Sequence, residues 1–202
     1  MPLLYPNDTP DAAAPLNAEA LYVVYPDYPV NTDSWYGYTT LVGHAGVPLI
    51  SANGLTKYYE FGRYLPGKLG RTRNVTVPNT TIDSNGKSTS GSLAAVLKKL
   101  SASSGKNTRI RAAYFLNVDF DKMNATAAEA PGTYDITGNN CGHFAERVVL
   151  AGNSQIDRPT IINPTPNNFV DEYIEEKNAE VLYDPGTGLI TIGKGDEDDA
   201  KR

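Results

Sequence analysis

Apolar residues recur along this chain with two periods, one typical of strands and one typical of helices. Residues 21–25 form a short apolar run that ends at a proline, which predicts a β-strand. Leu93, Val96, Leu97 and Leu100 are spaced as on one face of a helix. By the same criteria we expect strands over 21–25, 36–41, 43–50, 55–61, 109–116, 181–183 and 189–192, and helices over 90–100, 119–130, 139–152 and 169–176.

Residues 64–87 follow neither period. They are rich in Gly, Pro, Asn and Thr, which predicts a long surface excursion with one extended piece near 75–77. A basic cluster lies in or beside this segment, and we interpret it as part of an exposed linker: Arg63, Lys68, Arg71 and Arg73.

The composition fits one globular domain. With 202 residues, of which 40% are hydrophobic and 20% charged, the chain is long enough to bury a core. We expect a flexible lead-in over 1–19, which is rich in Pro, Asp and Ala, a single domain over 20–194, and a disordered acidic tail over 195–202.

Charge and hydropathy argue against several classes of protein. A net charge of -5 gives no support to nucleic-acid binding, because phosphate repels an acidic surface. No apolar stretch approaches the length of a membrane span. The first residues lack a basic segment and a sustained apolar core, so we expect no signal peptide and synthesis in the cytoplasm. One cysteine and two distant histidines do not have the spacing of a zinc site.

The single cysteine, Cys141, lies where an irregular segment gives way to a predicted helix. Asn139 or Asn140 is expected to cap this helix, and Gly152 to end it. A thiol in the first turn of a helix faces unpaired backbone N–H groups and the positive end of the helix dipole, which favour the thiolate. Cys141 is therefore a candidate nucleophile, the alternative being a small buried core residue. His143, two residues further on, is expected at the surface or at a secondary site.

His44 is the candidate base for this thiol, and Glu60 is the candidate acceptor that orients its imidazole. The two residues lie on the strands of a predicted hairpin with Asn-Gly at its turn. A two-residue turn would put them on opposite faces, so that Tyr59 or Arg63 would share the face of His44 instead. A loop of three or five residues, or a bulge near Pro48, would bring His44 and Glu60 to one face. The alternatives are a strand histidine with satisfied hydrogen bonds and an exposed glutamate.

Three strings carry a family resemblance: GHAGV at 43–47, YYEFGRY at 58–64 and NNCGHFA at 139–145. Together they resemble the circularly permuted branch of the NlpC/P60 papain-like superfamily, in which the histidine precedes the cysteine. They are also similar to papain-like effectors that bacteria deliver through type VI secretion to hydrolyse peptide bonds in the cell wall of rivals. The resemblance covers residues 20–152.

The resemblance implies an α+β papain-like fold, with an antiparallel sheet packed against a few helices. It implies Cys141 as nucleophile, His44 as base and Glu60 as the orienting residue, without a metal or an organic cofactor. The implied reaction is hydrolysis of an amide in a peptidoglycan peptide through a thioester acyl-enzyme. The backbone N–H of Cys141, helped by Asn140, would stabilise the oxyanion, and Tyr59 is a further candidate contact for the substrate.

The same resemblance implies partners and a place of action. A secretion-system component would export the protein, an immunity protein would protect the producer, and the protein would act in the periplasm of the target cell. Two other functions stay open. One is an acyltransferase or lipid thioesterase on the same fold, which an apolar groove beside Cys141 would favour. The other is a noncatalytic interaction domain.

Overall fold

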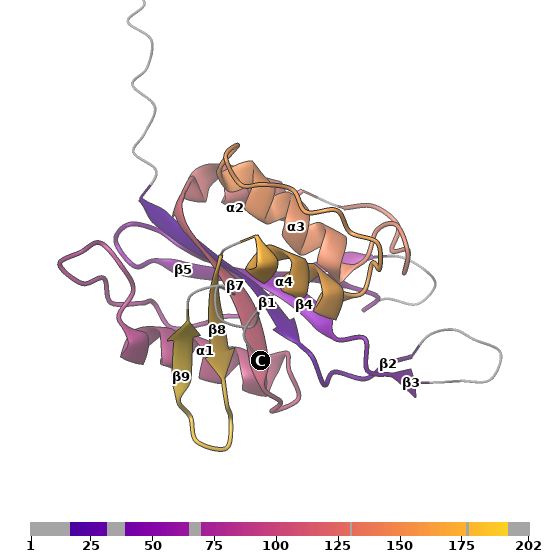
Figure 1. Ribbon diagram of the computed structural model, residues 1–202, viewed down its shortest axis with the longest axis horizontal. Helices are drawn as coiled ribbons and strands as arrows, with labels where there is room; N and C mark the ends of the chain where they lie inside the picture. The colour runs from indigo at the N-terminus through magenta and orange to yellow at the C-terminus, as the bar shows by residue number, and fades with distance from the viewer. Residues whose placement is uncertain (1–16, 32–38, 65–69, 130, 177, 194–202) are drawn as a thin grey trace, which may run out of the picture.

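A seven-stranded antiparallel sheet organises the part of the chain that the computed structural model describes, residues 17–31, 39–64, 70–129, 131–176 and 178–193. The strands lie in the order β6-β5-β4-β1-β7-β8-β9 (Figure 1). Their bounds are β1 Ala18–Tyr25, β4 His44–Ile50, β5 Thr56–Gly62, β6 Arg71–Asn74, β7 Ile110–Val118, β8 Ala179–Tyr183 and β9 Ile190–Gly193. A separate two-strand ladder joins β2 (Val30–Asn31) to β3 (Thr39–Thr40).

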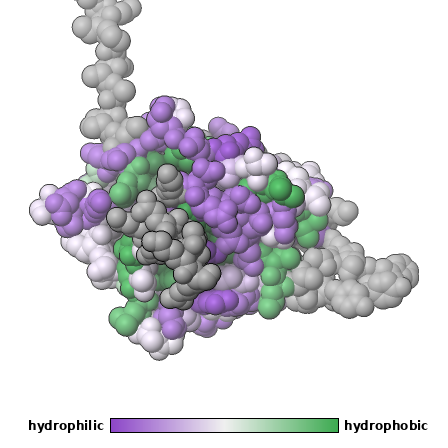
Figure 2. All heavy atoms as spheres, in the orientation of Figure 1, coloured by the Kyte–Doolittle hydropathy of each residue, from purple (hydrophilic) through white to green (hydrophobic). Residues whose placement is uncertain are grey.

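Helices cover both faces of this sheet (Figure 1). Three of them, α2, α3 and α4, pack on one face, and α1 packs on the other. The surface over α2, α3 and α4 in this view is mainly hydrophilic (Figure 2), as expected of amphipathic helices. The bounds are α1 Ser90–Ser103, α2 Phe120–Ala128, α3 Cys141–Gly152 and α4 Pro166–Glu175.

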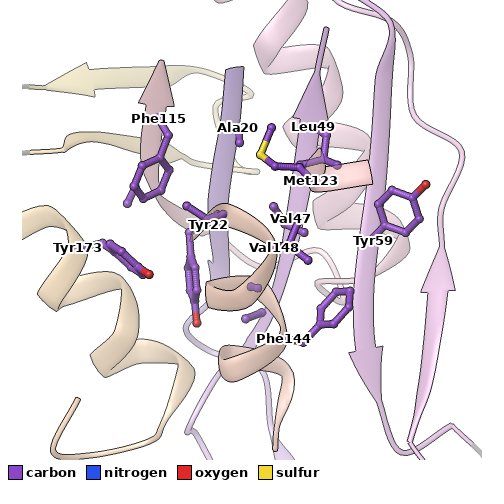
Figure 3. Packing of buried hydrophobic residues seen from close by; sticks show 14 of the residues in the cluster. Ala20, Tyr22, Val47, Leu49, Tyr59, Phe115, Met123, Phe144, Val148 and Tyr173 are labelled. Carbon is purple, nitrogen blue, oxygen red and sulfur yellow. The ribbon is translucent and has the colours of Figure 1, made fainter. Parts of the chain in front are cut away.

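The central strand β1 shows why the core has two halves. All eight of its residues are buried, because helices lie over both faces of the sheet. Tyr22 packs in the cluster formed with α2, α3 and α4, as Figure 3 shows, together with Phe144 and Val148 of α3. The neighbouring Leu21 and Val23 point to the other face and pack against α1.

The α+β class and the main elements predicted from the sequence are confirmed, with ends that differ by a few residues. One prediction is wrong: the extended piece in the 64–87 excursion is Arg71–Asn74, and not 75–77. These residues form a strand because they complete a ladder with β5, whereas Val75 and Val77 pack against the α1 cluster. The expectations for 1–16, 32–38 and 194–202 lie outside the described residues. Within the described ranges, no helix is long and apolar enough to cross a bilayer.

Candidate active site

His44 and Glu60 lie on the same side of the β4–β5 hairpin. The connection spans residues 51–55, an odd number, so Gly46 pairs with Glu60, and His44 shares the face of both. The Nε2 atom of His44 lies 3.3 Å from Oε2 of Glu60. Of the registers considered for the sequence, the one that unites the two residues is formed.

The helix α3 brings Cys141 to this pair. Cys141 is the first residue of α3, and its thiol and the His44 imidazole are hydrogen-bonded to each other. The thiol also contacts the backbone N–H of Ala45 and the hydroxyl of Tyr134. Because Nε2 of His44 faces Glu60, the other ring nitrogen, Nδ1, is left for the thiol. Cys141 is only 3% exposed, so this pair is largely shielded from water.

The charges at these three residues support one another. Burial alone would lower the pKa of His44, but the Cys141 thiolate and the Glu60 carboxylate raise it to about 10. Burial alone would raise the pKa of the Cys141 thiol, but the neighbouring His44 lowers it below its ordinary value. Burial alone would raise the pKa of Glu60, but other contacts, above all the hydrogen bond and charge of His44, lower it to about 2. The arrangement favours a thiolate–imidazolium pair near neutral pH.

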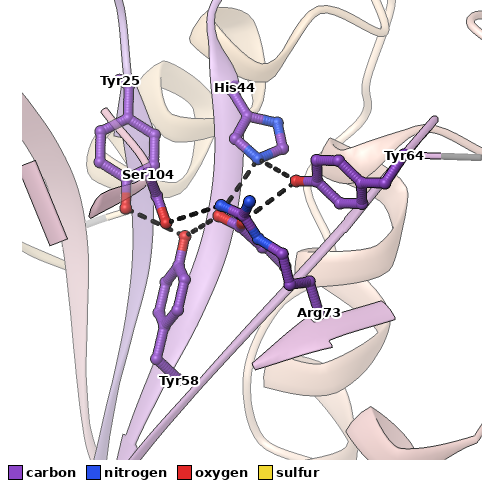
Figure 4. A network of polar contacts seen from close by, with 7 residues as sticks. Tyr25, His44, Tyr58, Tyr64, Arg73 and Ser104 are labelled. Carbon is purple, nitrogen blue, oxygen red and sulfur yellow. Dashed lines mark hydrogen bonds and ion pairs between the residues drawn. The ribbon is translucent and has the colours of Figure 1, made fainter. Parts of the chain in front are cut away.

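Glu60 is fully buried and receives four donors (Figure 4). Besides His44, the hydroxyl of Tyr58 donates to Oε2 at 2.8 Å, and the hydroxyl of Tyr64 donates to Oε1 at 3.0 Å. The guanidinium of Arg73, which lies opposite Glu60 in the β5–β6 ladder, forms an ion pair with Oε1. Tyr64 also lies 3.1 Å from Nε2 of His44. A carboxylate with this many donors is held in one position, which in turn fixes the imidazole.

Sequence reasoning missed these supporting residues. Tyr58 could have been found, because it precedes Glu60 by two residues on a strand and therefore shares its face. The interpretation of Arg73 as an exposed linker residue is wrong, since Arg73 belongs to β6 and pairs with the buried Glu60. No local signal in the sequence marks this pairing, which depends on strand register.

Asn140 holds the start of α3. Its side-chain Oδ1 accepts hydrogen bonds from the backbone N–H groups of Gly142 and His143, at 2.7 and 3.2 Å. Its Nδ2 donates to the carbonyls of Ile136 and Pro164, at 2.8 and 2.7 Å. Both N–H bonds of the amide are therefore in use. Asn140 therefore caps α3. It has no free N–H bond with which to give an oxyanion the help that the sequence analysis expected.

Tyr59 does not join His44. It lies on the sheet face that carries α2 and α3 (Figure 3), and its hydroxyl donates to Oδ1 of Asn124 in α2 at 2.7 Å. Because the hairpin register places Glu60 with His44, the neighbouring Tyr59 must point to the opposite face. The expectation that Tyr59 contacts a substrate thus depended on the register that is not formed.

A cavity of about 280 Å³ reaches the thiol. We call it the thiol cavity. Apart from Cys141 itself, none of the described residues that line it carries a charge, and its walls are largely apolar. Besides Cys141, these walls include Val30, Val42, Tyr134, Ile136, Pro164 and Pro166. The groove beside Cys141 is thus the apolar kind that the sequence analysis associated with acyl transfer.

Comparisons with known proteins agree with this geometry. Residues 20–157 match the family described as type VI secretion system effector, TseH-like. Among solved structures, the chain is similar to the crystal structure of the type VI secretion system effector TseH. The two are 29% identical with a TM-score of 0.72, and the match covers 87% of this chain and 97% of that one. The comparison with curated proteins found no match. The family match spans the elements that carry the site, from β1 to α3.

Proposed function

Because this chain belongs to the TseH-like family of type VI secretion system effectors, we propose that it is a cysteine hydrolase that cleaves amide bonds in peptidoglycan peptides. A member of this family is exported from the bacterial cell, and we place its action in the periplasm of the target cell. The proposal includes an immunity protein that protects the producer. The single observation that carries the enzymatic part is the buried Cys141–His44–Glu60 constellation at the N-terminus of α3.

The proposed reaction uses these three residues in two stages. The Cys141 thiolate attacks the amide carbonyl carbon, a C–S bond forms, and the carbonyl oxygen becomes an oxyanion. When the oxyanion collapses, the C–N bond breaks and the His44 imidazolium gives its proton to the leaving amine. Water then attacks the thioester while His44 takes a proton from it, which releases a carboxylic acid and restores the thiolate–imidazolium pair. Glu60 keeps the imidazole oriented throughout.

Two donors are suited to stabilise the oxyanion. The backbone N–H of Cys141 has no acceptor inside the helix, because Cys141 is the first residue of α3. The hydroxyl of Tyr134 contacts the thiol and lines the thiol cavity. We assign to Tyr134 the role that the sequence analysis gave to Asn140.

Replacing Tyr134 with phenylalanine is expected to lower kcat about 10²-fold with little change in KM, because an oxyanion donor acts mainly in the transition state. The ring would still pack against Phe61, whose centroid lies 5.4 Å away. Steady-state kinetics on a soluble muropeptide would measure both constants. Tyr173→Phe is the matched control, since its buried hydroxyl has no hydrogen-bond partner within the described residues. An unchanged kcat in Tyr134→Phe would remove Tyr134 from the mechanism.

One observation favours a second function. The uncharged, largely apolar walls of the thiol cavity fit an acyltransferase or thioesterase that acts on an apolar acyl group. The cavity volume of about 280 Å³ lies just below the range of about 300–1,000 Å³ typical of small-molecule sites, which limits the length of chain it could hold. We therefore keep amide hydrolysis as the main proposal.

Digestion of purified peptidoglycan tests the function. The walls would be incubated with the protein or with Cys141→Ala, and the soluble muropeptides analysed by mass spectrometry. New fragments that appear only with the unsubstituted protein support a thiol-dependent wall hydrolase and identify the bond. Identical profiles on walls of several chemotypes would exclude peptidoglycan as substrate, and assays with thioester substrates would then test the second function.

A further inference from the structure

A second cavity adjoins the thiol cavity. It has a volume of about 380 Å³, and Thr137 and Pro164 line both. We call it the ion-pair cavity, because Glu146 and Arg158 lie in its wall. The two cavities are therefore neighbours.

The ion pair in this cavity leaves donors for a ligand. Glu146 is only 3% exposed, and its two oxygens accept hydrogen bonds from Nε and Nη2 of Arg158 at 3.2 and 3.3 Å. These bonds neutralise the buried carboxylate. The Arg158 side chain is 71% exposed, and a guanidinium has five N–H bonds, so further donors of Arg158 can reach a bound group.

His143 adds a donor to the same cavity. Its Nδ1 faces the backbone N–H of Asn140 at 3.5 Å and accepts from it, which assigns the ring proton to Nε2. Burial lowers the pKa of His143, so the ring is neutral near pH 7 and keeps this arrangement. Arg158 and His143 together offer N–H groups to a carboxylate.

The thiol cavity, in contrast, has no cationic side chain among the described residues that line it. Apart from Cys141, the part of its lining that the structure describes includes no charged residue, and Arg63, which affects the phenol of Tyr134, is not among those residues. The His44 imidazolium beside Cys141 is already paired with the thiolate and with Glu60, so a carboxylate placed in this cavity would lose hydration without a free cationic partner in the described lining, which is costly. A methyl side chain, however, would contact Val30, Ile136 and Pro166 at no such cost.

We propose that the two cavities form one substrate groove, which selects an amide bond between alanine and a residue that carries a carboxylate beside its reacting amine. The alanine lies in the thiol cavity, and the carboxylate lies at Arg158 and His143. This inference rests on the proposed function and names its substrate class. Peptidoglycan offers such a bond in cross-links between alanine and diaminopimelate. It also offers γ-glutamyl bonds, whose acyl residue carries a free carboxylate close to the scissile carbonyl, and the groove disfavours these.

Three soluble peptides test the inference with the protein as it is. The first has alanine joined to the side-chain amine of diaminopimelate. The second has lysine in place of diaminopimelate and so lacks the carboxylate. The third has glutamate joined to diaminopimelate through its γ-carboxyl group. We expect the first to have the highest kcat/KM, with KM for the second at least about tenfold higher and kcat/KM for the third at least about tenfold lower.

Substituting Arg158 gives an independent check. Arg158→Gln is expected to raise KM for the diaminopimelate peptide toward that of the lysine peptide, and to change KM for the lysine peptide much less. Because this change leaves the buried Glu146 without its partner, thermal melting is used to check that the variant folds. If it does not fold, the three peptides with the unsubstituted protein still test the inference. Preferred cleavage of the γ-glutamyl peptide, or equal KM for diaminopimelate and lysine peptides, would overturn the inference while leaving the proposed function intact. Failure to cleave any peptide or any wall would instead reject the proposed function.

Discussion

Replacing Cys141 with alanine is expected to lower the rate of peptidoglycan hydrolysis by at least about 10³-fold, because the nucleophile of the acyl-enzyme is lost. The fold should survive. Cys141 is a small residue, and Asn140, which caps α3, is unchanged. We expect a loss of less than about 1.5 kcal/mol in the free energy of unfolding. Initial rates on purified walls and a thermal melt of the same sample would measure both effects.

Cys141→Ser is the matched control for this prediction. It keeps a hydrogen-bonding group at the position, but its hydroxyl does not ionise beside His44 as the thiol does. We expect serine to be nearly as inactive as alanine. Activity within tenfold of the unsubstituted protein in the alanine variant would contradict a nucleophilic role for Cys141.

Replacing Glu60 with glutamine is expected to lower kcat about 10²-fold and to reduce the free energy of unfolding by about 3 kcal/mol. The carboxylate is fully buried and receives only donors, from His44, Tyr58, Tyr64 and Arg73. A glutamine would bring its own N–H bonds against those donors and would leave Arg73 without its charged partner. Urea unfolding and kinetics on one muropeptide would measure the two losses.

The contribution of Glu60 to stability should depend on pH differently from that of an exposed acid. Its pKa of about 2 in the folded protein lies below the value near 4.3 of an unfolded chain. The stability contributed by Glu60 is therefore complete above about pH 4.3 and is lost as the pH falls through 2. Glu60→Gln should lack this part of the acid sensitivity. Asp27→Asn is the control, because Asp27 pairs with Arg109 in an exposed ion pair worth about 0–1 kcal/mol. If the two substitutions changed the acid-dependent part of the stability by the same amount, Glu60 would contribute no more to it than an exposed acid does.

Much of the fold follows from local patterns in the sequence. The helix with Leu93 and Leu97 on one face, and the apolar strand at 21–25, were predictable because burial imposes the periods of 3.6 and 2 on them. The capped helix start at Cys141 was predictable because Asn140 is one of the few residue types that can accept the orphan N–H groups there.

The rest of the site depends on long-range register. Whether Glu60 or Tyr59 shares a face with His44 is decided by one residue in the length of the hairpin loop, and loop length was left open by the sequence. The pairing of Arg73 with Glu60 depends on a further strand, β6, whose polar residues show no strand period. Residues such as Tyr134 and Arg158 reach their cavities from loops, where no sequence periodicity applies.

The central claim is that Cys141 and His44 form a reactive ion pair, and the rate at which iodoacetamide alkylates Cys141 tests it most directly. Cys141 is the only thiol in the chain, so the mass of the intact protein reports on it alone. Because His44 lowers the thiol pKa and the imidazole keeps its proton up to about pH 10, the rate should change less between pH 7 and 9 than it does for an ordinary thiol. In His44→Ala the rate at pH 7 should be lower, and it should rise more steeply with pH, because burial then raises the thiol pKa without the offsetting imidazolium. A pH profile that is as steep in the unsubstituted protein as in His44→Ala, with equal rates at pH 7, would contradict the claim.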